Sequence, residues 1–147
     1  DHPSATLSVM MTGFGLRLDP DLCWENLRRL SKDAADRAML QSCLRRTLDD
    51  VAALAHLQPR VRVVKGIWHE PESVAYLDAP TIRRNYLAIL GALIACGGYP
   101  EVATHDVWLI EHSLGLLAGL SPAQYEFQML LGYIARDAPS QLFATAR

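Results

Sequence analysis

The sequence predicts an α/β fold built on a parallel sheet, and two short segments carry that prediction. One is the β-branched run from Arg60 to Gly66, and the other is the run from Ala103 to Asp106. Each run ends abruptly in glycine or polar residues, and a long helical pattern lies between them. This order is typical of a β-α-β unit, whose chemistry lies at the carboxyl ends of its strands.

The first half of the chain contains two β-α units. The apolar run Leu7–Thr12 is the first predicted strand, and a helix follows with Asp19 as its N-cap and Pro20 at its first position. Leu40–Leu44 is a very short apolar piece that we interpret as the second strand. The next helix begins at Thr47–Asp50, which resembles a capping box with Asp in place of the usual Glu.

The third unit is the clearest. Val61–Gly66 is its strand, and Pro71–Pro80 is a loop. Thr81 is the expected N-cap of the next helix, which Gly97 and Gly98 end. The expected inner face of this helix consists of Ile82, Tyr86, Ile89, Leu90 and Leu93.

The remaining elements repeat the alternation. Glu101–Thr104 is another strand, and Asp106 is the expected N-cap of the helix after it. Phe127–Leu131 is a further short strand, and Pro139 begins a last helical piece. The total is about five β-α units, whereas a closed eight-unit barrel usually needs about 250 residues. The pattern therefore predicts either an open sheet or part of a barrel.

Composition indicates one globular domain, 1–147, and argues against several classes of protein. The chain has 147 residues, of which 50% are hydrophobic. Its net charge of −2, with no basic run, gives nucleic-acid binding no electrostatic support. No apolar segment reaches the roughly 18 residues of a membrane span, and we expect no signal peptide.

The cysteines and histidines give no metal site. Cys23, Cys43 and Cys96 are widely spaced, and we interpret them as buried thiols in a reducing cytoplasm. The histidines lack metal-ligand spacing. The sequence also contains no Walker loop, no G-x-G-x-x-G and no G-x-S-x-G elbow.

Strand parity selects candidate site residues. Side chains alternate along a strand, so Arg62, Val64 and Gly66 share one face while Val61 and Val63 share the other. If the two valines pack under helices, Arg62 points to the opposite, inner face. A buried guanidinium needs an anion or an acceptor, so Arg62 is either a structural ion pair or a ligand-facing charge.

The neighbouring strand end offers a second group of candidates. Gly66 allows a ligand to approach the backbone closely. Thr104-His105-Asp106 stands where a strand becomes a helix, and backbone amides there suit anionic groups such as phosphates. The simpler interpretations are an ordinary N-cap for Asp106 and a hydrogen-bonded loop residue for His105.

Five blocks occur in a fixed order: Gln41–Thr47, Arg60–Pro71, Asn85-Tyr86, Tyr99–Asp106 and Tyr125–Gly132. They contain the strings R-V-V-K-G, A-T-H-D and Y-E-F-Q-M-L. In order and spacing these blocks resemble the catalytic domain of proline dehydrogenase, an FAD-dependent enzyme. The resemblance implies a partial (β/α)8 TIM-type barrel that lacks the second unit and the final units.

The resemblance also implies an activity. In the family, proline is oxidised by hydride transfer from its C5 to N5 of FAD, giving 1-pyrroline-5-carboxylate. This reaction is the first step of proline catabolism to glutamate, and the electrons pass to a quinone. The implied partners are therefore proline and a quinone. We expect a cytoplasmic location, with peripheral membrane contact of the full-length protein.

Several positions match the family's cofactor contacts. Arg62 matches the arginine beside the flavin ring, where its charge would stabilise the reduced, anionic flavin. Gln41 matches a glutamine at the isoalloxazine edge. The other matching positions are Val64, Lys65, Gly66 and Ile67 at a strand end, Thr104 and His105 near the phosphate and ribitol, and Gln128.

The sequence departs from the family at substrate-binding positions. Met10 replaces a lysine of the first strand, and Trp68 stands where tyrosine is usual. The strand that carries the active-site aspartate should precede Gln41, but no room is left for it. The two adjacent arginines that bind the substrate carboxylate have no counterpart in 1–147.

Three hypotheses follow. The first is a piece of a proline dehydrogenase, whose activity resides in the full gene product. The second is a catalytically dead remnant of the family that at most binds flavin. The third is an unrelated open-sheet binding module, which would require the matching blocks to be coincidental.

Overall fold

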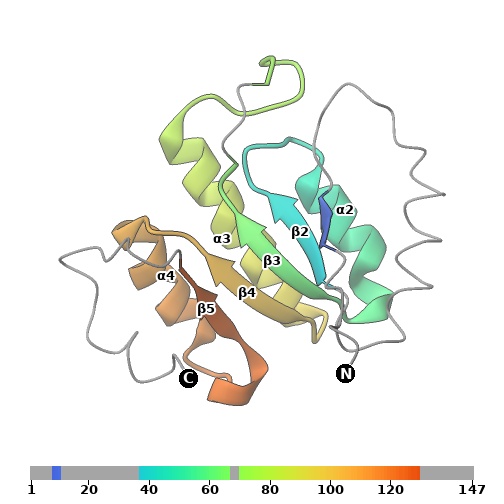
Figure 1. Cartoon of the computed structure of the whole chain (residues 1–147), viewed down its shortest axis with the longest axis vertical. Coiled ribbons are helices and arrows are strands. Elements are labelled where there is room, and N and C mark those ends of the chain that lie inside the picture. Colours follow the sequence, from blue (N-terminus) through green and yellow to red (C-terminus); the bar gives the residue numbers. More distant parts are fainter. Residues whose placement is uncertain (1–7, 11–36, 67–69, 130–147) are drawn as a thin grey trace, which may run out of the picture.

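The computed structural model describes residues 8–10, 37–66 and 70–129, and these form one parallel sheet (Figure 1). The sheet has five strands in the order β1-β2-β3-β4-β5, so that each strand pairs with the next one along the chain. All four pairings are parallel. The strands are β1 (Ser8–Met10), β2 (Arg37–Gln41), β3 (Arg60–Val64), β4 (Tyr99–Ala103) and β5 (Glu126–Gln128).

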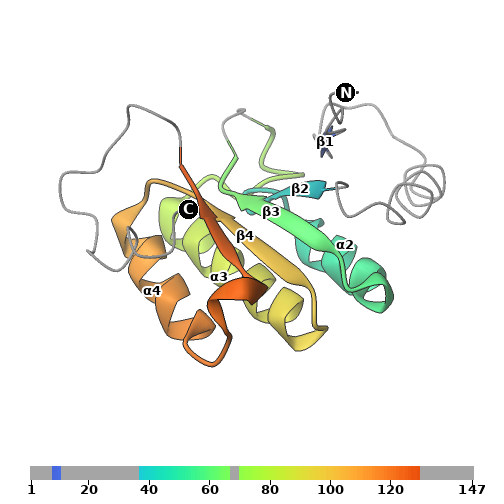
Figure 2. The ribbon, with the colours of Figure 1, turned by 60° about the horizontal axis from the view of Figure 1, so that its bottom comes forward.

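Within the described residues, three α-helices connect the strands from β2 to β5 and lie on one side of the sheet (Figure 2). They are α2 (Thr47–Leu54), α3 (Ala79–Ala95) and α4 (Val107–Leu117). A short 3₁₀ turn, η1 (Ala55–Leu57), follows α2, and another, η2 (Pro122–Gln124), precedes β5. The predicted α/β class with a parallel sheet is therefore confirmed, and the described strands form an open sheet with β1 and β5 at its edges.

The core lies between the sheet and the helices. The strands contribute Val61, Val63 and Val102, which are fully buried. β-branched side chains suit this environment because they fill the pleated surface with little loss of rotamer freedom. The helix side of the core is formed by Val51, Leu54, Tyr86, Ile89, Leu90, Leu93, Leu109 and Leu117. Most of the predicted inner face of α3 is thereby confirmed.

Tyr86 joins the helix layer to the sheet. Its hydroxyl donates a hydrogen bond to the carbonyl oxygen of Val63, at 2.8 Å. Burial raises the pKa of Tyr86 far above its usual value, so the phenol stays a donor at all relevant pH values. The bond satisfies a polar group that would otherwise be costly in this apolar layer.

Two predicted helix caps are wrong, although α2 begins at Thr47 as expected. The N-cap of α3 is Asp78, whose carboxylate accepts from the amide of Thr81 at 2.8 Å, so Thr81 lies inside the helix. Pro80 is tolerated in this first turn because its missing N–H would have no helical partner there. The capping box at Thr47–Asp50 is also absent, because the Thr47 hydroxyl donates to the carbonyl oxygen of Gln41 instead.

The strand boundaries differ from the predictions by a few residues at both ends, and β2 ends at Gln41 instead of Leu44. β2 begins at Arg37, before the apolar piece that was expected to begin at Leu40, because parallel pairing with β1 and β3 extends it. β4 likewise begins at Tyr99. The predicted stop at Gly97 is confirmed, since this residue has φ +75° directly after α3.

Some predictions lie outside the described residues. These are the helix that begins at Asp19, the last helical piece at Pro139, and the positions of Ile67 and Trp68. The side chain of Met10 is not described either, although its backbone pairs with Met39 in β2.

Candidate active site at the carboxyl edge of the sheet

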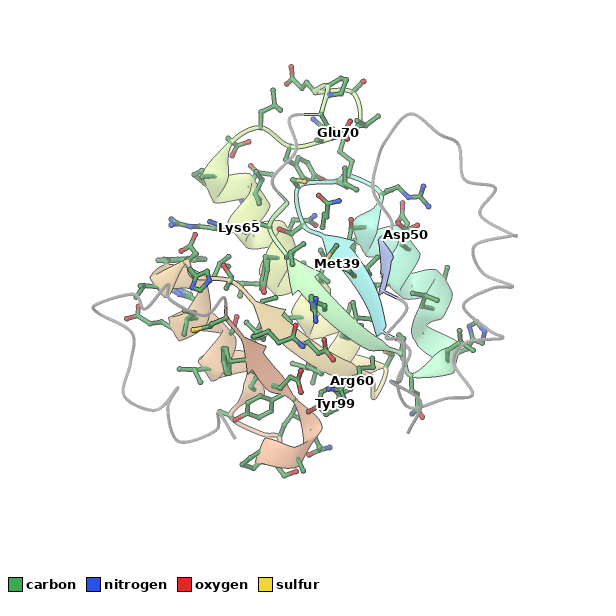
Figure 3. All side chains as sticks on the ribbon, in the orientation of Figure 1. Met39, Asp50, Arg60, Lys65, Glu70 and Tyr99 are labelled. Carbon is green, nitrogen blue, oxygen red and sulfur yellow. The ribbon has the colours of Figure 1, made fainter. Side chains whose placement is uncertain are left out.

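The fold brings most of the predicted cofactor-binding residues to one edge of the sheet. Gln41, Val64 and Gln128 are the last residues of β2, β3 and β5. Lys65 and Gly66 follow β3 directly, and Thr104 and His105 follow β4. Figure 3 shows Lys65 near this edge, with Arg60 and Tyr99 at the opposite end of the strands. Parallel strands place their carboxyl ends together, which is why these separate blocks converge.

Arg62 lies on the face of the sheet opposite the helices. Along β3 the side chains alternate, with Val61 and Val63 fully buried and Arg60, Arg62 and Val64 partly exposed. The predicted parity is confirmed. The register pairs Arg62 with Met39 on one side and Glu101 on the other, so these residues form one row across this inner face.

The surroundings of Arg62 are compatible with both of its interpretations, as a structural ion pair and as a charge that faces a ligand. Its Nε lies 3.7 Å from Oε2 of Glu101, close enough for an ion pair and too far for a hydrogen bond. Within the described residues this buried Nε has no hydrogen-bond partner. The side chain is nevertheless 34% exposed, so its charge reaches the open inner face.

Glu101 is a member of the site that the sequence reasoning missed. Its carboxylate is fully buried and accepts hydrogen bonds from Nε of Arg60 and from Nε2 of Gln128, the latter at 2.6 Å. Arg60 also binds Glu126 at 2.8 Å. The sequence offered only the place of Glu101 at the start of a predicted short strand, because the pairing with Arg62 is visible in the structure alone.

Gln128 is held by this network. Its amide nitrogen donates to carboxylate oxygens of both Glu101 and Glu126. Only the carbonyl oxygen of its side chain is therefore directed away from the carboxylates. The predicted contact of Gln128 with a cofactor remains a prediction, and it would have to use that oxygen.

Gly66 has no room for a side chain. Its φ is +104°, a region that L side chains rarely adopt, and a Cβ there would lie 2.3 Å from Sγ of Cys43 and 2.9 Å from Oε1 of Gln41. The amides of Ser42 and Cys43 donate to the carbonyl oxygens of Val64 and Lys65. The ends of β2 and β3 are thus joined tightly, which fixes the buried side chain of Gln41 at the edge.

Cys43 is an inert thiol in this arrangement. It is buried and unpaired with any other described cysteine. Burial has the largest effect and raises the pKa of the Cys43 thiol. A backbone hydrogen bond has a smaller effect and lowers this pKa, and the charge of Glu70 raises it. A thiol of this kind is a poor nucleophile at neutral pH. The structure therefore agrees with the expectation of a buried structural cysteine here.

Asp106 connects three elements at the same edge. It is the N-cap of α4, as predicted, and accepts two hydrogen bonds from Arg83 of α3, at 2.9 and 3.0 Å. Lys65 lies 3.1 Å from the same carboxylate. Burial alone would raise the pKa of Asp106, but the hydrogen bonds from Arg83 and Lys65 outweigh it and hold the pKa below its usual value.

Thr104 and His105 occupy the turn between β4 and α4. Thr104 is buried, and its Oγ1 accepts from the backbone amide of Asp106 at 3.2 Å. His105 is partly buried beside it. The hydrogen bond to Thr104 joins the end of β4 to the N-cap of α4, and the two residues lie at the carboxyl edge.

The chemistry available here is that of a site for an anionic, planar or phosphate-bearing ligand. Arg62 supplies positive charge on the inner face, and the turn with Thr104 and His105 places the N-terminus of α4 at the carboxyl edge. Among the described residues, no group of His, Cys, Asp and Glu could hold a metal ion. No helix within the described ranges is long and apolar enough to cross a membrane.

Curated proteins of similar sequence share one name. Over 108 residues the chain is 42% identical to the proline dehydrogenase of Deinococcus radiodurans, a match that covers 72% of this chain and 34% of that protein. It is 29% identical over 160 residues to proline dehydrogenase 2 of Bacillus subtilis, covering 86% of this chain and 53% of that protein. The chain is a partial homologue of the proline dehydrogenases.

Solved structures agree on the fold of the chain. Proline utilization A from Bdellovibrio bacteriovorus superimposes with a TM-score of 0.70 at 20% identity, covering 85% of this chain and 15% of that one. The protein of the same name from Bradyrhizobium japonicum gives a TM-score of 0.64, also at 20% identity. No protein-family model matches the chain.

The match is partial in two senses. The chain spans between about a third and a half of the length of these curated relatives. The alignment with the Bacillus subtilis enzyme also runs over 160 residues while using 86% of this chain, so the relative has residues inside the matched span that this chain lacks. The difference is of the order of one β-α unit, for which roughly 30 residues are needed.

Proposed function

We propose that the chain forms the flavin-facing part of an FAD-dependent proline dehydrogenase, which oxidises L-proline to 1-pyrroline-5-carboxylate as the first step of proline catabolism. The observation that carries the proposal is Arg62, a cation on the inner face whose buried Nε has no hydrogen bond among the described residues. The sequence similarity to named proline dehydrogenases supports the reaction class.

The residues at the carboxyl edge fit FAD. A buried guanidinium nitrogen without a hydrogen bond favours a ligand that brings an acceptor, because leaving the donor unsatisfied costs about 1–3 kcal/mol. At Gly66 the space that a Cβ would need is filled by Cys43 and Gln41, and this close packing of the ends of β2 and β3 holds Gln41 beside Val64. Gln41, Val64, Lys65 and Gly66 would line the ring, with Ile67 next in the chain. Thr104 and His105 would face the ribitol and phosphates.

Bound FAD would supply the hydride acceptor, at N5, for the hydrogen on C5 of proline. The protein's part is electrostatic and positional. Arg62 places a fixed positive charge where negative charge develops during the transfer, and such preorganised charge is often the largest contribution to catalysis. The hydrogen-bonded ends of β2 and β3 hold Gln41 and Gly66 at constant distance from that charge.

The substrate side of the site needs residues beyond those described. Met10, which matches a lysine position of the family, pairs with Met39, and Met39 pairs with Arg62. The Met10 position therefore belongs to the Arg62 row without adding a charge. We propose that the missing second unit and the paired arginines for the carboxylate belong to the intact barrel, together with quinone reduction. Cytoplasmic location with peripheral membrane contact is likewise part of this proposal.

A catalytically dead remnant is the second candidate, and Met10 is the observation that favours it. A remnant could bind flavin through Arg62 and Gly66 without turning over proline, because the carboxylate partners would be absent. Losing charged partners of a desolvated ligand costs a few kcal/mol each.

The deciding experiment is the visible absorption spectrum of the purified chain after expression with riboflavin, followed by anaerobic addition of proline. A flavin band that bleaches with proline would support the proposed enzyme within this chain. A band that ignores proline would favour a flavin-binding remnant or fragment. A colourless protein, with the fold verified by circular dichroism, would contradict flavin binding by the isolated chain. Arg62→Met is the matched variant, because it removes the charge and leaves the core untouched.

A further inference from the structure

We infer that Glu101 is a positioning residue for Arg62, and that its buried carboxylate lowers the reduction potential of the flavin that Arg62 faces. This inference rests on the proposed function, and it concerns a residue that the matching sequence blocks assign no role. The argument begins with the inner face, where two cations and two carboxylates of β3, β4 and β5 form one network.

The register places this network across β3, β4 and the edge strand β5. Arg62 pairs with Glu101 in β4, and Glu101 pairs with Glu126 in β5, so the three side chains form one row on the same face. Arg60 lies two residues before Arg62 and binds both carboxylates. The four charged groups sum to zero.

Glu101 occupies the centre of that row, and its two carboxylate oxygens have different neighbours. Oε1 accepts from Nε of Arg60. Oε2 accepts from Gln128 at 2.6 Å and lies 3.7 Å from Nε of Arg62. The side chain is fully buried, so water screens its charge poorly. Among the described residues, the ion pair with this carboxylate is the charge contact of Arg62.

The geometry keeps Arg62 available. Arg60 and Gln128 satisfy the carboxylate of Glu101 with short hydrogen bonds, whereas Arg62 has only the longer ion pair. Glu101 thus attracts the guanidinium of Arg62 to the inner face, while the Nε–H of Arg62 stays available to a ligand. At the same time it offsets part of the positive charge that a bound flavin would meet. Removing the carboxylate charge should make reduction of the flavin easier.

Glu126 provides the matched control. It belongs to the same network through Arg60 and Gln128, but its side chain is 32% exposed, whereas that of Glu101 is fully buried. Solvent screens an exposed carboxylate more strongly than a buried one. A change of charge at Glu126 should therefore affect Arg62 much less than the same change at Glu101.

The experiment compares the chain with Glu101→Gln, Glu101→Asp and Glu126→Gln, each loaded with FAD, by dye equilibration of the two-electron midpoint potential. We expect Glu101→Gln to raise the equilibrium constant for reduction at least tenfold, a shift of about 30 mV. Glu101→Asp and Glu126→Gln should stay within threefold of the parent. Equal shifts in Glu101→Gln and Glu126→Gln, or no shift in Glu101→Gln, would overturn the inference.

A second measurement needs no flavin and keeps this inference separate from the proposed function. The Nε–H signal of Arg62 in ¹⁵N-edited NMR spectra can be assigned by its absence in Arg62→Lys. We expect slow exchange with water in the parent and in Glu126→Gln, and exchange at least tenfold faster in Glu101→Gln. If the parent binds no flavin, the proposed function fails for this chain. Unchanged exchange in Glu101→Gln would then overturn the role of Glu101.

Discussion

The two faces of the sheet differ sharply in the kind of interaction they contain. The face toward the helices is apolar, with Val61, Val63 and Val102 fully buried under α3 and its neighbours. The opposite face carries Arg60, Arg62 and Glu101 within the same strands. Because strand residues alternate, five consecutive residues of β3 serve both purposes. Stability is concentrated on one face, and the candidate chemistry lies on the other.

The largest expected effect tests the apolar face. Leu90→Ala should destabilise the fold by about 2–5 kcal/mol, because Leu90 is fully buried and its truncation leaves a cavity. Urea unfolding followed by circular dichroism measures the loss. Leu116→Ala, on the exposed side of α4, should cost no more than about 0.5 kcal/mol. Similar losses in the two variants would mean that the helix layer is not packed as described.

Substitution of charged residues should change stability by different amounts, depending on whether the residue binds the buried Glu101. Arg60→Met removes the main partner of the buried Glu101 carboxylate and should cost about 1–3 kcal/mol, less than for a fully buried pair because Arg60 is 27% exposed. Unfolding in urea again gives the number. Arg84→Met is the control, since Arg84 is exposed on α3 and should change stability by less than about 0.5 kcal/mol. A neutral Arg60→Met would show that the network adds no stability.

The close packing at the carboxyl edge can be tested by substituting Gly66, with Gly91 in α3 as the control. Gly66→Ala should cost about 1–3 kcal/mol, because φ is +104° and the new Cβ would collide with Cys43. Gly91→Ala, inside α3 with open space around it, should stabilise the fold by about 0.5–1 kcal/mol. Differential scanning calorimetry would show midpoints that move in opposite directions. Movement of both midpoints in the same direction would contradict this account of the edge.

The smallest effect concerns acid stability. The folded-state pKa of Asp106 is lowered, so its stabilising contribution is present above the usual aspartate pKa of about 4 and is lost as the pH falls through the folded value. Asp106→Asn should therefore cost about 1 kcal/mol at neutral pH, and the cost should vanish in strong acid. Unfolding measured from neutral to acidic pH tests this. Asp49→Asn, at an exposed carboxylate, is the control and should cost less than about 0.5 kcal/mol at neutral pH.

Much of the fold was predictable, because the local patterns agreed with the tertiary structure. The alternation of side chains in Val61–Gly66 predicted both the strand and its two faces. The glycine pair after α3 likewise predicted where this helix ends. The helix starts were less predictable. Thr81 and Thr47 are both suitable caps by residue type. In the structure, however, Asp78 accepts from the amide of Thr81, and the Thr47 hydroxyl donates to the carbonyl oxygen of Gln41. Such choices depend on geometry that the sequence pattern does not contain.

The candidate site was predictable only in part. Arg62 and Gly66 were identifiable because strand parity and a chain-terminating glycine are local signals. Glu101 was missed as a site member because its partners Arg60 and Gln128 lie 41 and 27 residues away in the chain. The pairing of Asp106 with Arg83 was missed for the same reason, since it depends on how α3 packs beside α4. Long-range pairing of charges therefore had to come from the structure.

The identical order of strands in the chain and in the sheet has a consequence for how the protein can assemble and change. Each strand can dock on the one synthesised just before it, so the chain needs no long-range threading, and each loop closure has a modest entropic cost. The sheet can then grow on the ribosome in the order of synthesis. A β-α unit gained or lost between two strands also leaves its neighbours parallel and free to join. The uneven alignment with the Bacillus subtilis relative is the pattern expected of a protein that changes length one unit at a time.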